Sequence, residues 1–166
     1  ILSVPSANKY QKEGGPSLAS IVEAIKKHLS FPFKDILLLA KITVFNYLVG
    51  NCDYHAKNLS VLHDDGYKLT PFYDLVSTYA FDDIDSDVAM SINKKYEINQ
   101  ITRNDFITMF DSWGIGGRKT LDLILKEFDH ITTYADELAV NPLLDLHQDH
   151  IKKIIDIIKI HYKKLA

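Results

Sequence analysis

The segment from Lys34 to Val49 limits the fold more than any other part of this sequence. It is apolar at nearly every position, including Ile36, Leu37, Leu38, Leu39, Ile42, Val44, Phe45, Tyr47 and Leu48. A helix with so few solvent-facing positions has to be covered by other elements over most of its surface. We therefore predict a central core helix over this segment, around which the rest of the chain packs.

Further helices are predicted on both sides of this segment. Before it, apolar residues recur at three- and four-residue steps between Ser17 and Leu29, which indicates an amphipathic helix whose first turn Ser17 can cap. After it, Thr102 and Asp105 form a capping-box pattern at the start of another helix. The helices expected in the second half span about residues 103–112, 118–132, 133–139 and 149–165.

The last predicted helix has an apolar face and a basic face. Ile151, Ile154, Ile155 and Ile158 recur at helical spacing and predict a packed face, while its lysines would extend their ammonium groups to solvent. We expect His161, in the same helix, to be a surface or partly packed residue.

A β-hairpin is predicted between the helical regions. Asp65 and Gly66 separate two short strand-like runs, residues 59–62 and 67–69. Glycine supplies the positive φ angle that a tight turn between twisted strands requires. Residues 88–92 are a further candidate strand. The predicted fold class is therefore mainly α with a small β-hairpin, in one domain.

The composition is that of an ordinary globular domain, with 46% apolar residues among 166. The formal net charge of −3 gives no reason to expect direct binding of nucleic acid, which usually requires a strong positive excess. The single cysteine, Cys52, cannot form an internal disulfide, and this fits a reducing compartment such as the cytoplasm. No apolar run approaches the roughly 20 residues of a membrane span, so we expect no membrane association.

Three polar residues flank the predicted hairpin in an order that suits phosphoryl transfer. Asp53 and Asn58 precede the hairpin, and Asp74 follows it. Transfer of phosphate from ATP requires a carboxylate near the acceptor hydroxyl and hard oxygen ligands for magnesium. We interpret Asp53 as the proton acceptor and Asn58 and Asp74 as magnesium ligands, with Lys57 helping to keep Asp53 ionised. The alternative is that Asp53 and Asn58 only stabilise a turn through local hydrogen bonds.

Four segments of the chain form a recognisable set: Lys-Tyr-Gln-Lys-Glu-Gly-Gly-Pro-Ser at 9–17, Asp-x-His-x-Lys-Asn at 53–58, Leu-Thr-Pro-Phe-Tyr-Asp-Leu at 69–75 and Met-Ser-Ile-Asn at 90–93. Together they resemble HipA-like serine/threonine kinases, the toxins of HipA/HipB toxin–antitoxin systems. The resemblance covers most of the chain and implies a protein-kinase-like C-terminal lobe. The interval between the Asp and Asn of the second segment equals that of the protein-kinase catalytic loop.

The resemblance also implies cofactors, partners and residue roles. The cofactors are ATP and Mg²⁺, and the partners are a protein substrate, in the translation machinery, and a HipB-like DNA-binding antitoxin. The implied site consists of Asp53 as the catalytic base, Lys57 beside the transferred phosphate, His55 and Tyr73 at the nucleotide, and Asn58 and Asp74 on magnesium.

The sequence shows no features of the N-terminal lobe of a kinase. A kinase needs a β-rich lobe with a phosphate-covering loop and a lysine on a strand, but no glycine-rich loop follows a strand here and few residues precede Gly14. We expect residues 1–166 to form a single HipA-like C-terminal kinase lobe, without the ATP-gripping N-terminal lobe, and to transfer phosphate poorly or not at all alone. The start at Ile1 suggests a fragment, so an N-terminal kinase lobe would be a further partner. Lys94 stands where many relatives carry glycine.

Two alternatives to a protein kinase remain open. Aminoglycoside and choline kinases resemble the Asp-x-His-x-x-Asn pattern too, so a small-molecule phosphotransferase is one alternative. The other is a non-catalytic interaction module that binds an antitoxin or a separate N-terminal lobe. The presence of Asp53, Asn58 and Asp74 together argues against the module, because such a module has no need for magnesium ligands at this spacing.

Overall fold

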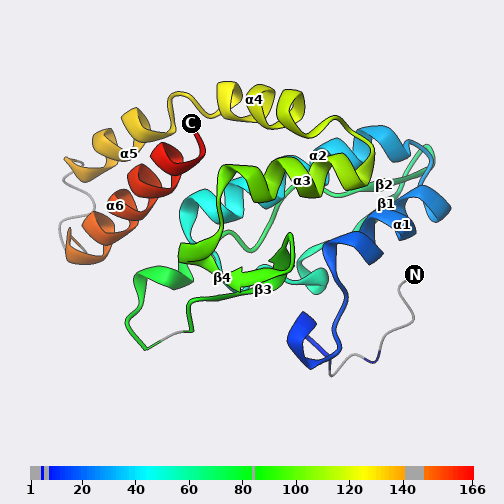
Figure 1. Cartoon of the computed structure of the whole chain (residues 1–166), viewed down its shortest axis with the longest axis horizontal. Coiled ribbons are helices and arrows are strands. Elements are labelled where there is room, and N and C mark those ends of the chain that lie inside the picture. The colour runs from blue at the N-terminus through cyan, green and yellow to red at the C-terminus, as the bar shows by residue number, and fades with distance from the viewer. Residues whose placement is uncertain (1–4, 6–7, 84, 141–147) are drawn as a thin grey trace.

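The computed structural model describes Pro5 and residues 8–83, 85–140 and 148–166. These residues form a helical body with two small β-hairpins, and this confirms the predicted fold class (Figure 1). The α-helices are α1 (Leu18–His28), α2 (Pro32–Val49), α3 (Arg103–Trp113), α4 (Gly117–Glu127), α5 (Ile131–Ala139) and α6 (Gln148–Leu165). The strands are β1 (Val61–His63), β2 (Tyr67–Leu69), β3 (Asp87–Ile92) and β4 (Lys95–Glu97), and the short 3-10 helices are η1 (Gln11–Glu13), η2 (Ala56–Asn58), η3 (Thr78–Ala80) and η4 (Ile98–Gln100).

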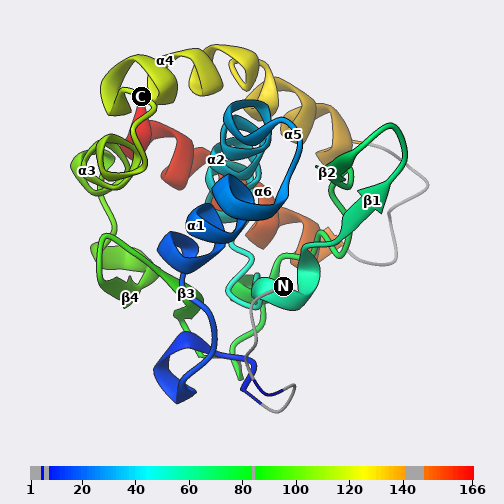
Figure 2. The same ribbon diagram turned by 90° about the vertical axis from the view of Figure 1, so that its right-hand side faces the viewer.

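Helix α2 forms the centre of the core, as its apolar sequence predicted (Figure 2). Helices α1, α4 and α6 and strand β2 pack against it, and the ring of Tyr47 contacts Phe106 of α3 with centroids 5.3 Å apart. The helix begins at Pro32, earlier than predicted, because proline lacks the N–H group that the first turn of a helix leaves unbonded. Four of its residues are completely buried: Leu39, Ala40, Val44 and Leu48.

The predicted helix starts at Ser17 and Thr102 are confirmed. The Ser17 hydroxyl accepts a hydrogen bond from the Ser20 N–H at 3.1 Å. The Thr102 N–H donates to Asp105 Oδ2 at 2.8 Å, as a capping box requires. Both helices contact strand β3 of the second hairpin.

Residues 118–139 differ from the prediction of a long helix followed by a short one. Helix α4 ends at Glu127 and α5 begins at Ile131. At the break, the ring of Phe128 packs against Phe45 of α2, with centroids 5.7 Å apart. The break lets α5 turn and pack along α6, where Ala135 lies in a small apolar cluster with isoleucines of α6.

Each hairpin is antiparallel. Both strands of the first were predicted, with β1 placed at residues 59–62, but only one strand of the second was predicted. Strands β1 and β2 pair with Val61 opposite Leu69, across the expected turn at residues 65–66. Strand β3 pairs with β4, which was not predicted because its residues, Lys95–Glu97, lack an apolar run. Asn93 and Lys94 form the tight turn between them, both with positive φ angles of 49° and 67°.

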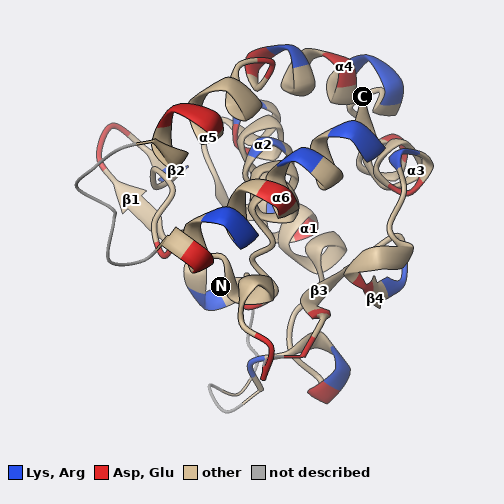
Figure 3. Cartoon of the chain, turned by 90° about the vertical axis from the view of Figure 1, so that its left-hand side faces the viewer, with Lys and Arg blue, Asp and Glu red and all other residues tan. Residues whose placement is uncertain are grey.

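Charges of both signs are interspersed along α4 and α6 (Figure 3). Lys153 of α6 pairs with Asp82, which follows η3, at 2.8 Å, and Lys159 pairs with Asp136 of α5 at 2.5 Å. These pairs place a carboxylate beside two of the lysines of α6. The described helices include none that is both long and apolar enough to cross a bilayer.

Candidate active site

Asp53 lies on the loop that follows the core helix. Gly50 ends α2 in the left-handed conformation, with a φ angle of 72°. The loop then runs beside β3, where the carbonyl oxygen of Cys52 accepts a hydrogen bond from the Ala89 N–H at 2.8 Å. The loop backbone is therefore fixed to a strand, while the side chain of Asp53 remains 34% exposed.

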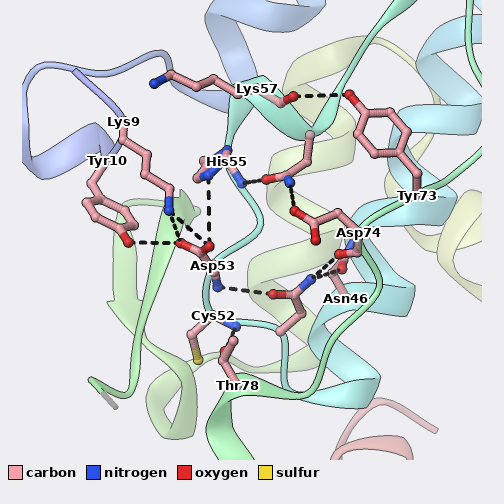
Figure 4. Close-up of polar contacts among 12 residues, drawn as sticks. Lys9, Tyr10, Asn46, Cys52, Asp53, His55, Lys57, Tyr73, Asp74 and Thr78 are labelled. Carbon is pink, nitrogen blue, oxygen red and sulfur yellow. Dashed lines mark hydrogen bonds and ion pairs between the residues drawn. The ribbon is translucent and has the colours of Figure 1, made fainter. Parts of the chain in front are cut away.

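Two side chains from the start of the chain contact the Asp53 carboxylate (Figure 4). Lys9 Nζ lies 3.0 Å from both Oδ1 and Oδ2, and the Tyr10 hydroxyl donates a hydrogen bond to Oδ1 at 2.9 Å. Sequence reasoning used these residues only for the family resemblance and gave them no role in the site. Their placement depends on a tertiary contact across more than forty residues, which no local pattern reports.

Asn58 and Asp74, the two predicted magnesium ligands, lie in direct contact. Asn58 is buried at the end of η2, and its Nδ2 donates to Asp74 Oδ2. Its Oδ1 accepts a hydrogen bond from the His55 backbone N–H at 3.0 Å. Asp74 has a left-handed backbone, with a φ angle of 57°, and its side chain comes from the segment after the first hairpin. The hairpin therefore returns the chain so that Asp74 meets the loop of Asp53.

Asn51 joins the two halves of the site. Its Oδ1 accepts a hydrogen bond from the Asp53 N–H at 3.1 Å, and its Nδ2 donates to the Asp74 carbonyl oxygen at 3.3 Å. The same Nδ2 also donates to Asn46 Oδ1 of α2 at 2.7 Å. One buried amide thus holds both acidic residues in position relative to the core helix.

His55 is buried beside Asp53. Its Nε2 lies 3.9 Å from Asp53 Oδ2, and its ring stands edge-on to that of Tyr10 with centroids 6.4 Å apart. Burial lowers the pKa of His55 more than the neighbouring Asp53 raises it, so the imidazole is neutral at pH 7. Within the described part of the chain, the buried Nδ1 has no hydrogen-bond partner.

Lys57 and Tyr73 are linked through the backbone. The Tyr73 hydroxyl donates to the Lys57 carbonyl oxygen at 3.0 Å and lies 2.7 Å from the Ser60 hydroxyl. The Lys57 side chain is exposed, and its ammonium pairs with no carboxylate of the described residues (Figure 4). Tyr73 as a whole residue is 39% exposed. Both side chains are therefore accessible to a ligand.

An open cleft of about 580 Å³ adjoins Asp53. Its walls include Tyr10, Thr78 and a group of acidic side chains, Asp83, Asp85 and Asp87. Cys52 also lines the cleft, but burial raises the pKa of its thiol to about 12, and a buried protonated thiol is a poor nucleophile. Carboxylates therefore predominate among the charged side chains of the cleft, beside Lys12.

The donor atoms around Asp74 suit magnesium better than a transition metal. Asp74 offers hard carboxylate oxygen atoms, which Mg²⁺ prefers, and Mg²⁺ needs few protein ligands when it keeps waters and binds phosphate oxygens. The Asn58 amide turns its Nδ2 toward Asp74, while its Oδ1 accepts the hydrogen bond from the His55 N–H and has a second lone pair for a metal. The described residues contain no group of three or more His, Cys, Asp or Glu side chains arranged to hold a metal by themselves. The residues present therefore fit a magnesium ion that arrives with a nucleotide.

The sequence is similar to known proteins along almost its whole length. Residues 1–158 match the family described as the HipA-like C-terminal domain. A putative kinase, Y4mE of Sinorhizobium fredii, is 34% identical over 145 residues, which cover 87% of this chain and 34% of the relative. The serine/threonine-protein kinase toxin HipA of Shewanella oneidensis is 36% identical over 73 residues, which cover 43% of this chain and 17% of the relative. The chain thus spans about a third or less of the length of these relatives.

The fold is also similar to that of a solved structure. The HipA chain in the complex of Shewanella oneidensis HipA, HipB and operator DNA matches with a TM-score of 0.84. The match covers 98% of this chain and 41% of that chain, at 21% sequence identity. The structural match shows a shared fold, and the sequence match over residues 1–158 shows the family. The chain belongs to the family of HipA-like C-terminal domains.

Proposed function

We propose that this chain is the C-terminal lobe of a serine/threonine protein kinase, the toxin of a toxin–antitoxin system, that transfers the γ-phosphate of ATP to a protein hydroxyl. The observation that carries the proposal is the Asn51 amide, which ties the Asp53 loop to Asp74 while Asn58 contacts the Asp74 carboxylate. The proposed base and the two proposed magnesium ligands therefore lie on segments that are hydrogen-bonded to one another. The kinase names of two relatives support the same reaction class.

Asp53 takes the proton of the acceptor hydroxyl in this proposal. The hydroxyl oxygen forms a bond to the γ-phosphorus, the bond between that phosphorus and the β,γ-bridging oxygen breaks, and ADP leaves. Asp53 suits the role because its carboxylate is partly exposed beside an open cleft. Removal of a general base typically lowers the rate by about 10²–10⁴-fold.

Asn58 and Asp74 would hold magnesium, and Lys57, His55 and Tyr73 would contact the nucleotide or its phosphates. Magnesium bound there would neutralise charge on the phosphates of ATP. The exposed Lys57 ammonium is available to the transferred phosphate, and the exposed Tyr73 ring offers a surface for the nucleotide. The buried Nδ1 of His55 lacks a protein partner, and a ligand atom would supply one.

The partners follow from the relatives. The Shewanella HipA structure contains HipB and operator DNA, and we propose a HipB-like antitoxin as a partner of this protein, together with a protein substrate in the cytoplasm. Because the match covers less than half of that HipA chain, we also propose that residues 1–166 act with an N-terminal kinase lobe. No direct contact of this lobe with nucleic acid is required.

The test is transfer of radiolabelled γ-phosphate from ATP by the full-length protein. Asp53→Asn should lower the rate by at least about 100-fold, because the amide cannot accept the proton. Asp64→Asn, at an exposed position of the first hairpin, is the matched control and should keep the wild-type rate. Equal rates for Asp53→Asn and wild type would contradict the proposal. Label on an aminoglycoside or on choline, with none on protein, would favour the small-molecule alternative.

A further inference from the structure

The segment before α1 is fastened to the second hairpin. Gln11 Oε1 accepts hydrogen bonds from the Ser91 N–H at 2.9 Å and from its hydroxyl at 3.2 Å. Lys12 forms an ion pair with Asp87, and its Nζ lies 4.8 Å from the centre of the Tyr96 ring. These contacts attach η1 to both strands of the β3–β4 hairpin.

The turn at Gly15 then fixes the backbone of Tyr10. The Gly15 N–H donates to the Tyr10 carbonyl oxygen at 2.9 Å. A side chain at this position would come within 2.7 Å of that oxygen, which is closer than carbon atoms approach, so only glycine allows the bend. The result is a rigid support for the two side chains that reach Asp53.

Lys9 and Tyr10 both remain donors at neutral pH. The hydrogen bond to Asp53 raises the pKa of the Lys9 ammonium, so Lys9 stays charged. The hydrogen bond to the same carboxylate raises the pKa of the Tyr10 hydroxyl, so its proton stays in place. Asp53 therefore faces one cation and one neutral donor.

The two oxygens of Asp53 are engaged unequally. Oδ1 accepts a hydrogen bond from Tyr10 at 2.9 Å and contacts Lys9 at 3.0 Å. Oδ2 accepts a hydrogen bond from Lys9 at 3.0 Å, and His55 Nε2 stands further away, at 3.9 Å. A carboxylate oxygen has about two lone-pair sites, so Oδ2 retains room for one more donor.

We propose that Lys9 and Tyr10 are positioning residues for phosphoryl transfer, which hold the Asp53 carboxylate in one orientation and leave one lone pair of Oδ2 for the acceptor hydroxyl. The inference rests on the proposed function, in which Asp53 takes the hydroxyl proton. Lys9 balances the charge of the carboxylate, and Tyr10 occupies Oδ1 and so prevents rotation of the group. In this proposal neither Lys9 nor Tyr10 contacts ATP.

The test measures kcat and the KM for ATP in the full-length protein. Lys9→Met should lower kcat roughly 10- to 100-fold and leave the KM within about 2-fold, because the contact is with the base and not the nucleotide. Lys9→Arg should restore part of the rate. Tyr10→Phe should lower kcat roughly 3- to 10-fold, as expected for one lost hydrogen bond. Lys26→Met, on the exposed face of α1, is the control and should behave as wild type.

The outcomes separate this inference from the proposed function. If Asp53→Asn is inactive but Lys9→Met keeps the wild-type kcat, the inference fails and the proposed function stands. A raised KM for ATP with unchanged kcat in Lys9→Met would also overturn it, as would a rate loss that tracks loss of folded protein in a thermal melt. If Asp53→Asn is as active as wild type, the proposed function fails and takes the inference with it.

Discussion

Asn51 shows how much of the site depends on a residue that no motif singles out. It is 4% exposed and bonds to the backbone at Asp53 and Asp74 and to the side chain of Asn46. The Asp-x-His-x-Lys-Asn pattern predicted the acidic and amide groups of the site from their order along the chain. It did not predict Asn51, Lys9 or Tyr10, because their importance appears only when distant segments are brought together.

Replacement of Asn51 by alanine should affect both stability and nucleotide binding. The change leaves the Asp53 N–H and the Asp74 carbonyl without their partner, and we expect unfolding to become easier by about 1–3 kcal/mol. ATP binding should weaken because no hydrogen bonds from residue 51 then link the backbone at Asp53 to that at Asp74. Urea denaturation and calorimetry would measure these effects. Asn104→Ala, at an exposed position of α3, should change stability by less than about 0.5 kcal/mol.

His161 is buried in the core, although we expected it at the surface or partly packed. It is 2% exposed, its ring stacks on that of Tyr47 with centroids 4.5 Å apart, and its Nδ1 lies 2.7 Å from the Tyr47 carbonyl oxygen. A carbonyl oxygen only accepts hydrogen bonds, so Nδ1 carries the proton of a neutral imidazole. A histidine among isoleucines and lysines gives no sequence signal that distinguishes this role.

The stability of the chain should fall as the pH is lowered from about 6.5, the ordinary pKa of histidine. Burial lowers the pKa of His161 in the folded state, so the unfolded chain takes up this proton first, and stability present above pH 6.5 is lost below it. His161→Gln should reduce the slope of the free energy of unfolding against pH in this range. Some slope should remain, because burial also lowers the pKa of His55. Urea denaturation of wild type and His161→Gln between pH 7.5 and about 5 would measure this slope. A slope equal to wild type in His161→Gln would contradict the assignment, and His28→Gln, exposed on α1, is the control.

At the level of elements, apolar periodicity predicted the helices and missed what depends on contacts between them. The caps at Ser17 and Thr102 set helix starts correctly because both are local hydrogen-bond patterns. The break at Phe128 and strand β4 were missed. Phe128 is placed by its contact with Phe45 of the core helix, and β4 pairs with β3 through backbone hydrogen bonds that its side chains do not encode.

The turn of the second hairpin should be improved by glycine. Asn93 and Lys94 both have positive φ angles, and a side chain such as that of lysine is strained there. Lys94→Gly should raise the free energy of unfolding by about 0.5–1 kcal/mol, measured by urea denaturation. The same change at Lys119, an exposed position within α4, should lower it by about 1 kcal/mol. A loss of stability in Lys94→Gly would contradict this account of the turn.

For the whole molecule, the candidate site is one surface assembled from three segments. Lys9 and Tyr10 come from the N-terminal segment, Asp53 and Asn58 from the loop after α2, and Asp74 from beyond the first hairpin. The mainly helical lobe and the order of the motif residues could be predicted because both depend on local sequence patterns. The relative placement of the segments could not, because it depends on packing around α2.

The 166-residue chain alone should transfer phosphate poorly or not at all. The described residues contain the candidate base and magnesium ligands, but no β-rich lobe to cover the phosphates of ATP. We expect less than about 1% of the full-length rate, since positioning of ATP supplies most of the catalysis in phosphoryl transfer. Parallel assays of both forms with the same protein substrate would show it, and comparable rates would contradict the assignment of this chain as one lobe.

Magnesium-dependent binding of ATP tests the central claim most directly. Calorimetry on the full-length protein would compare wild type with Asp74→Asn, which keeps a residue that tolerates the left-handed backbone and removes its charge. Asp65→Asn, at another exposed left-handed position, is the matched control. We expect wild-type ATP binding to require Mg²⁺ and to weaken at least about 10-fold in Asp74→Asn but not in Asp65→Asn. Affinity that is the same in wild type and Asp74→Asn, with or without Mg²⁺, would contradict a phosphoryl-transfer site built on Asp53, Asn58 and Asp74.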